Sequence, residues 1–144
     1  MGDGFDGSSF KSLGNNTFSN FTISENGGVF YVGDADNNSI YLNSDKFNNN
    51  KSDKKGGAIA YLGDYLNIAD LNILDVSDTL FDTNKSNYGG AIHNSSSIFN
   101  ITAQNKQVLF DGNTDSNGSN ATTMQNTVKQ LLNSTQTAVI TFFQ

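Results

Sequence analysis

The side chains that could do chemistry in this chain are one histidine, His93, and several closely spaced aspartates. The aspartates form a pair and a looser group: Asp34 with Asp36, and Asp75 with Asp78 and Asp82. Two carboxylates placed on either side of a bond are the machinery of a glycosidase, and carboxylate oxygens also bind calcium. The first question is whether either arrangement completes a site.

Neither does. Catalysis or metal binding at His93 needs converging partners, and the sequence places none beside it. The G-G-x-G-x-D repeat that binds calcium in some β-helices is absent. We therefore predict no catalytic residue, no cofactor-binding residue and no metal ligand. We interpret the aspartates as a solvated acidic face and His93 as a surface residue.

The overall charge excludes two classes of partner. The chain has 144 residues, 8 Lys+Arg against 14 Asp+Glu, and a net charge of −6, which argues against nucleic acid or an anionic membrane as the partner. No apolar run approaches the roughly 18 residues of a membrane span, and "MGDGFDGSSF" is not a signal peptide, so an exported protein would have lost its signal. The N-x-[ST] sequons at Asn84 and Asn100 do not establish glycosylation, because a chain rich in Asn, Ser and Thr contains them by chance.

Two landmarks recur together along the chain. Successive phenylalanines are 29, 34 and 29 residues apart, at Phe18, Phe47, Phe81 and Phe110. Successive glycine-led segments are 29, 33 and 29 residues apart, at Gly27, Gly56, Gly89 and Gly118. Three of the phenylalanines have an asparagine three places later, namely Asn50, Asn84 and Asn113, whereas Phe21 takes that place in the first copy. A period near 30 residues indicates a repeat architecture.

The segments between the landmarks are short apolar runs such as "SIYL", "SIFNITA" and "QVLF", without the 3.6-residue spacing of helices. Each period has room for three short strands, which is what a parallel β-helix requires. Every coil then lays its strands on those of the previous coil, about 4.8 Å away. We predict an all-β fold, a right-handed parallel β-helix of about four coils, with a short helix and strand at the C-terminus.

Stacking gives each recurring residue a role. A phenylalanine in every coil predicts an aromatic ladder inside the solenoid, formed by Phe47, Phe81 and Phe110. A recurring asparagine predicts a stack of amides that bond the backbone at a turn, and the glycines predict corners with positive φ. The first residue of each strand after the glycines is expected inside: Phe30, Ile59 and Ile92. The next residue then points outward: Tyr31, Ala60 and His93.

The pairing of F-x-x-N with G-G-A-[ILV] resembles the repeats of the chlamydial-type polymorphic membrane protein family, over about residues 18–113. Two copies fit well, at 47–59 and 81–92, and similar Asn-rich repeats occur in adhesin-like surface proteins of methanogenic archaea. The resemblance implies a surface-exposed autotransporter passenger or adhesin built on a right-handed β-helix. Such passengers are commonly followed by a translocating outer-membrane barrel, which would be the only contact with a membrane. We expect a segment of a longer passenger.

The chain divides into three parts. Residues 1–17 are expected to form a partial coil or a frayed end, residues 18–120 the repeats, and residues 121–144 a cap or a continuation of the solenoid. In the last part Met124, Val128, Leu131 and Leu132 have helical spacing, and "TAVITFFQ" has the composition of a strand. The longer middle period predicts an outward loop around residues 63–65, where a deletion should be tolerated better than one within 81–92.

Three classes of function fit these observations. The first is a non-catalytic adhesin or passenger segment at the cell surface, outer-membrane associated through the parent protein, which binds a host or neighbouring-cell protein or glycan. The second is a structural spacer or a module that self-associates through the ends of the solenoid. The third is a β-helix enzyme acting on carbohydrate, which needs clustered carboxylates on one face. The recurring residues are used in turns and core, and outward positions are mainly Asn, Ser, Thr, Asp and Lys, which favours the first class.

Overall fold

The computed structural model describes residues 7–33, 37–62, 72–95, 98–116 and 123–124. Every regular element in these residues is a β-strand. The described part of the chain therefore contains no helix that could cross a membrane.

Twelve of the strands form three parallel sheets. Sheet 1 contains β1 (Ser9–Lys11), β5 (Ser39–Asn43), β9 (Ile73–Ser77) and β12 (Ile98–Thr102). Sheet 2 contains β2 (Thr17–Ser19), β6 (Lys46–Asn48), β10 (Leu80–Asp82) and β13 (Leu109–Asp111). Sheet 3 contains β4 (Phe30–Val32), β8 (Ile59–Tyr61), β11 (Ile92–Asn94) and β14 (Thr123–Met124). A smaller pair consists of β3 (Thr22–Ile23) and β7 (Lys51–Ser52).

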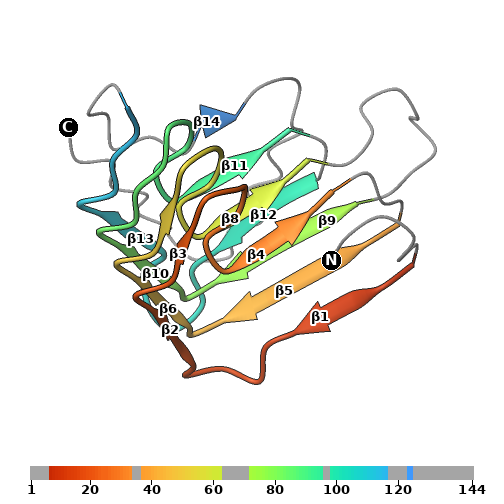
Figure 1. The fold of residues 1–144 in the computed structure, drawn as a ribbon. Helices are drawn as coiled ribbons and strands as arrows, with labels where there is room; N and C mark the ends of the chain where they lie inside the picture. The colour runs from red at the N-terminus through yellow and green to blue at the C-terminus, as the bar shows by residue number, and fades with distance from the viewer. Residues whose placement is uncertain (1–6, 34–36, 63–71, 96–97, 117–122, 125–144) are drawn as a thin grey trace.

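The chain visits the three sheets in turn, so it winds as a β-solenoid (Figure 1). Each coil contributes one strand to each sheet: coil 1 has β1, β2 and β4, coil 2 has β5, β6 and β8, coil 3 has β9, β10 and β11, and coil 4 has β12, β13 and β14. The path from β1 to β12 makes three full turns. The predicted parallel β-helix with three short strands per coil is therefore confirmed.

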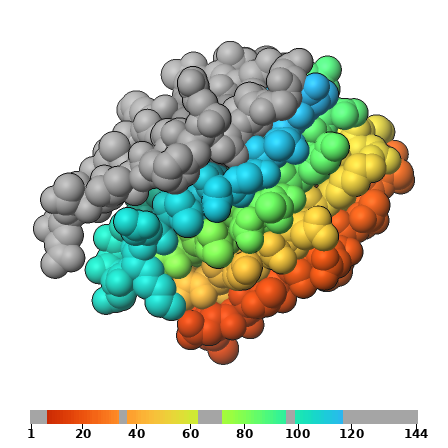
Figure 2. Space-filling view, turned by 90° about the vertical axis from the view of Figure 1, so that its left-hand side faces the viewer, coloured from red at the N-terminus to blue at the C-terminus, as the bar shows by residue number. Residues whose placement is uncertain are grey.

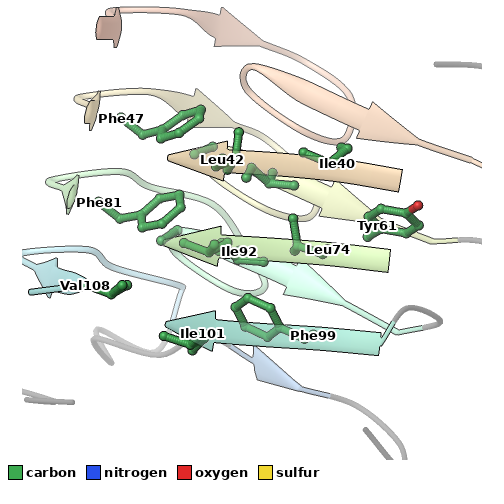
Figure 3. Packing of buried hydrophobic residues seen from close by; sticks show 14 of the residues in the cluster. Ile40, Leu42, Phe47, Tyr61, Leu74, Phe81, Ile92, Phe99, Ile101 and Val108 are labelled. Carbon is green, nitrogen blue, oxygen red and sulfur yellow. The ribbon is translucent and has the colours of Figure 1, made fainter. Parts of the chain in front are cut away.

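The core lies inside the solenoid and is built from stacked equivalent residues. Phe18, Phe47, Phe81 and Phe110 share one register in sheet 2. Their ring centroids are 4.9, 5.0 and 4.8 Å apart, with interplanar angles of 18°, 11° and 5°. Sheet 1 adds Ile40, Leu74 and Phe99, and sheet 3 adds Ile59 and Ile92, all buried (Figure 3). The predicted aromatic ladder thus exists and extends to Phe18.

Coil 1 contributes one phenylalanine from each sheet to the core. Phe30 of β4 lies 4.7 Å from Phe10 of β1 and 5.5 Å from Phe18 of β2, measured between ring centroids. All three are only partly buried, whereas their counterparts in coil 2, Ile40, Phe47 and Ile59, are fully buried. Coil 1 is therefore an aromatic layer that packs against coil 2.

Two adjacent glycines precede β4, β8 and β11 of sheet 3, and each of the two positions requires glycine for a different structural reason. The first, such as Gly56 with φ of 66°, adopts the left-handed conformation that turns the corner. The second, such as Gly57, lies so close to the next coil that a Cβ atom would overlap the carbonyl oxygen of Gly90. The Gly-Gly pair is thus one turn residue and one residue of close coil-to-coil approach.

The structure tests part of the helix that was predicted near the C-terminus. Thr123 and Met124, which were predicted to begin a helix, form β14 and pair in parallel with His93 and Asn94, so the prediction is wrong there. Pairing with the open edge of sheet 3 extends the solenoid and overrides the local helical spacing. The rest of the predicted helix and the terminal strand lie outside the described residues.

Residues 1–17 were expected to form a partial coil or a frayed end. Within them, strand β1 pairs with β5 over its whole length.

The loop predicted around residues 63–65 also lies outside the described residues. It falls between β8 and β9, which is the junction of coils 2 and 3.

Candidate functional site

The corner that follows sheet 2 contains the predicted asparagine ladder. The backbone N–H groups of Phe21, Asn50 and Asn84 donate to the Oδ1 atoms of Asn50, Asn84 and Asn113, at 3.2, 3.1 and 3.0 Å. Each Nδ2 also donates to the carbonyl oxygen of the ladder phenylalanine one coil earlier, at 2.8–3.0 Å. The three asparagines are buried and connect each coil to its neighbours. Their role is structural.

Two further ladders occupy the other corners, and the sequence analysis missed both. At the corner before sheet 2, the backbone N–H of Asn16 donates to Oδ1 of Asp45, and the backbone N–H of Asp45 donates to Oγ1 of Thr79. At the corner before sheet 1, the backbone N–H of Ser8 donates to Oδ1 of Asn38, and the backbone N–H of Asn38 donates to Oδ1 of Asn72. The signal for the last pair was available, because Asn38 and Asn72 both stand two residues before an inward residue of sheet 1.

The three ladders share one direction. In each, the backbone N–H of one coil donates to a side-chain oxygen of the following coil. The polar side chains at the corners are thereby used to join coils, which leaves them unavailable for a ligand.

His93 was predicted to be a surface residue, and that prediction is wrong. It lies on the outward side of β11, in register with Ala60 of β8, yet it is only 2% exposed and Ala60 is fully buried. Neither ring nitrogen has a hydrogen-bond partner among the described residues. Burial, with a smaller contribution from the positive charge of Lys55, lowers the pKa of His93 to about 4. His93 is therefore a neutral, buried imidazole at neutral pH, because the outward face of sheet 3 is covered at this position.

The looser group of aspartates does not form a paired site. Asp75 on sheet 1 is half-buried, and burial raises its pKa although a hydrogen bond from Asn100 acts in the opposite direction. Asp82 lies on sheet 2, where its carboxylate is 3.8 Å from the ammonium of Lys46. The two carboxylates thus belong to different sheets and have different partners.

Asp78 lies in the turn between those sheets and is almost buried. Burial works to raise its pKa, but hydrogen bonds from the backbone N–H groups of Gln104, Lys106 and Asn105 outweigh it and hold the pKa below the usual range. Asp78 is therefore a turn residue that anchors the chain after β12. Asp34 and Asp36 lie outside the described residues. No cluster of three or more metal-ligating side chains occurs in the part of the chain that the structure describes.

The outward faces of sheets 1 and 2 carry accessible rows of polar side chains. The parallel register aligns Lys11, Tyr41, Asp75 and Asn100 across sheet 1. It aligns Ser19, Asn48, Asp82 and Asp111 across sheet 2. We call these the polar rows; their side chains range from half-buried to exposed. They form a broad surface that contains an aromatic ring, charges of both signs and amides.

Comparison with known proteins identifies the repeat. Residues 46–60 and 78–95 match the model of the Chlamydia polymorphic membrane protein (Chlamydia_PMP) repeat. Each matched segment runs from sheet 2, through the ladder asparagine and the glycine pair, into sheet 3. No curated protein and no solved structure matches the chain.

Fold and repeat together define a class: a β-solenoid whose coils are stacked sequence repeats. Two of these coils carry the polymorphic membrane protein repeat, which confirms the predicted resemblance to that family.

Proposed function

We propose that the chain is a non-catalytic segment of a cell-surface adhesin passenger, and that its polar rows make the contact with another surface. The observation that carries the proposal is the repeat match over coils 2 and 3, whose outward faces on sheets 1 and 2 carry the centre of both rows. The ligand would be a protein or a glycan on a host or neighbouring cell. The parent protein would be extracellular and associated with the outer membrane.

The chemistry of the rows supports broad, weak contact. Tyr41 offers a ring face, Asn48 and Asn100 offer amides, and Lys11 and Asp111 offer charges of opposite sign. Hydroxyls and amides of a glycan or an extended peptide form hydrogen bonds with such groups, and a partly exposed aromatic ring packs against apolar patches. Affinity then depends on the area engaged, so that several molecules on one surface bind better than one.

Attachment of coated beads tests the proposal. Beads carrying the 144-residue chain are counted after washing on cultured animal cells, bacterial cells and immobilised polysaccharides. One variant replaces the row of sheet 1 (Lys11→Ser with Tyr41→Ser), and a second replaces the row of sheet 2 (Asn48→Ser with Asp111→Ser). These outward substitutions should leave the melting temperature nearly unchanged. We expect the unmodified chain to attach and at least one variant to lose most of the attachment.

The same design contains the contrary outcomes. If the unmodified chain attaches to no surface, the adhesin role fails and a spacer role takes its place. If both variants attach as well as the unmodified chain, the polar rows are not the binding surface. Turnover of any substrate in a polysaccharide and peptide panel, with or without calcium, would overturn the non-catalytic assignment in favour of an enzyme.

A further inference from the structure

Half of the chain's positively charged residues lie at one corner of the solenoid, between sheets 2 and 3. This corner carries Lys51, Lys54 and Lys55 in coil 2 and Lys85 in coil 3, which are four of the 8 Lys+Arg residues. Lys55 pairs in parallel with Tyr88 of coil 3, which is 58% exposed. We call these five residues the lysine corner.

The lysine corner lies in the middle of the stack of coils. The parallel register aligns Thr22, Lys51, Lys85 and Thr114, one residue from each coil. Figure 2 shows coil 2, in orange and yellow, and coil 3, in green, as bands between coil 1 in red and coil 4 in blue. Three of the four lysines are exposed, and Lys55 is partly exposed. The corner is therefore an accessible surface with a described coil on either side of it.

Carboxylates neutralise only two of the four lysines. The two ion pairs are those of Lys51 with Asp53 and of Lys54 with Glu25 of coil 1. Among the described residues, Lys55 and Lys85 form no ion pair. Residues 117–144, which follow this corner in coil 4, contain no Asp or Glu. Because salt screens exposed charges beyond about 8 Å at physiological ionic strength, distant carboxylates do not cancel the positive charge of the corner.

The fold does not require lysine in the row that crosses this corner. Thr22 and Thr114 occupy the same position in coils 1 and 4. Lys51 and Lys85 are direct neighbours in the row, and like charges placed opposite each other on adjacent strands are destabilising. An anion bound near both ammonium groups would relieve this repulsion.

We propose that the lysine corner binds an acidic glycan, a saccharide chain that carries carboxylate or sulfate groups. The ammonium groups of Lys55 and Lys85 can form charge-assisted hydrogen bonds with these acid groups. The exposed ring of Tyr88 packs against the apolar face of a sugar, and its hydroxyl adds a polar contact. The corner lies outside the polar rows, so this site goes beyond the proposed function and does not depend on it.

Nucleic acid is the competing polyanion, and the corner suits it less well. Double-stranded DNA carries one negative charge per roughly 1.7 Å, and a tightly bound protein contacts roughly 6–10 phosphates. Two lysines without a carboxylate partner, on a chain with a net charge of −6, are too few for such a partner. The acid groups of a glycan are separated by sugar rings, so two ammonium groups beside an aromatic ring match it better.

Surface plasmon resonance with four immobilised polymers tests the proposal on the 144-residue chain. Heparin carries sulfate and carboxylate groups, hyaluronan carries carboxylates alone, dextran is neutral, and a DNA duplex carries phosphates. We expect binding to heparin, to hyaluronan or to both at about 50 mM NaCl, and weaker binding at about 500 mM. We expect no binding to dextran. The first two surfaces distinguish sulfate from carboxylate as the group that is recognised.

The other coils supply substitutions that suit the fold. Lys85→Thr installs the residue type of Thr22 and Thr114, and Lys55→Asn installs that of Asn26, which also precedes the first glycine of its coil. The double variant should raise the dissociation constant for the acidic glycan by at least about tenfold. Its melting temperature should stay nearly unchanged, because exposed residues are replaced by those of other coils.

Lys46→Thr is the control with the same loss of charge. Lys46 lies on sheet 2, where it pairs with Asp82, and coil 1 has Thr17 at the same register. This variant should bind the acidic glycan as the unmodified chain does. The sheet 2 row variant of the attachment test should also keep this binding, so that a failure of the polar rows and a failure of the lysine corner are seen separately.

Four results would overturn the proposal. Absence of binding to both heparin and hyaluronan at low salt removes the site. Undiminished binding by the double variant places the contact elsewhere on the molecule. Equal weakening by Lys46→Thr reduces the effect to net charge. DNA bound as tightly as the acidic glycans makes the corner a site for phosphate backbones instead.

Discussion

The Oδ1 atom of Asn84 accepts two hydrogen bonds from Asn50, one from its backbone N–H at 3.1 Å and one from its side-chain amide at 2.9 Å. Asn84 in turn donates to the carbonyl oxygen of Phe47 at 3.0 Å and to Oδ1 of Asn113 at 2.9 Å. All of these polar groups are buried. A single amide thus connects three successive coils.

Asn84→Ala should lower the free energy of unfolding by about 2–4 kcal/mol, because it leaves two donors of Asn50 buried without an acceptor. Urea denaturation followed by circular dichroism measures the change. Asn87→Ala is the control: Asn87 is exposed in the same turn region, and its loss should cost no more than about 0.5 kcal/mol. Equal effects of the two substitutions would contradict the ladder's contribution.

Phe81→Ala should cost about 3–5 kcal/mol, since the ring is fully buried between Phe47 at 5.0 Å and Phe110 at 4.8 Å. Phe18→Ala should cost less, because Phe18 is partly buried and has a stacked ring only on the side of Phe47, beside its edge contact with Phe30. The urea midpoints of the two variants give the comparison. An unchanged midpoint for Phe81→Ala would place its ring outside the core.

Thr83→Asn should stabilise the fold by about 0.5–1 kcal/mol. Thr83 has a φ of 53°, which is strained for a β-branched residue, and the equivalent positions in the other coils hold Asn20, Asn49 and Gly112, also at positive φ. Thermal unfolding measures the gain, with Thr102→Asn in strand β12 as a control that should not stabilise. A lower melting temperature would mean that the hydrogen bond from Thr83 Oγ1 to Asn48 Oδ1, at 3.3 Å, outweighs the strain.

Acid should destabilise the protein through His93. Burial lowers its pKa to about 4, from an ordinary value of 6.5, so the folded state resists a proton that the unfolded chain accepts. Stability is therefore complete above pH 6.5 and falls between pH 6.5 and about 4, with a slope of at most about 1.4 kcal/mol per pH unit. The difference in unfolding free energy between wild type and His93→Leu isolates this contribution from those of the carboxylates. A difference that does not change with pH would show that His93 is solvated.

The recurring residues made the coil predictable. Phe47, Phe81 and Phe110 repeat with their asparagines and glycines, and a residue that recurs once per coil must stack on its copies. The corner ladder at Asp45 and Thr79 was not predictable in this way, because the residue type changes from one coil to the next while the geometry is kept.

The burial of His93 could not be predicted from the sequence for a different reason. Strand alternation correctly put Ile92 in the hydrophobic core and so predicted that the neighbouring His93 points to the opposite side of the strand. Alternation gives the direction of a side chain but not whether another part of the molecule covers that side, which depends on long-range contacts. The helix predicted at residues 123–124 failed for a related reason, since pairing with β11 decided the structure of these two residues.

The shared direction of the three ladders makes the two ends of the stack mechanically different. Peeling coil 1 away leaves bare oxygens, such as Oδ1 of Asn50, whereas peeling from the opposite end strips acceptors from backbone N–H groups, such as that of Asn84. Orphaned N–H groups are tolerated less well than orphaned oxygens. Each coil therefore has one face that offers ladder acceptors and one face that offers ladder donors, so the stack of coils has a chemical polarity from coil 1 to coil 4.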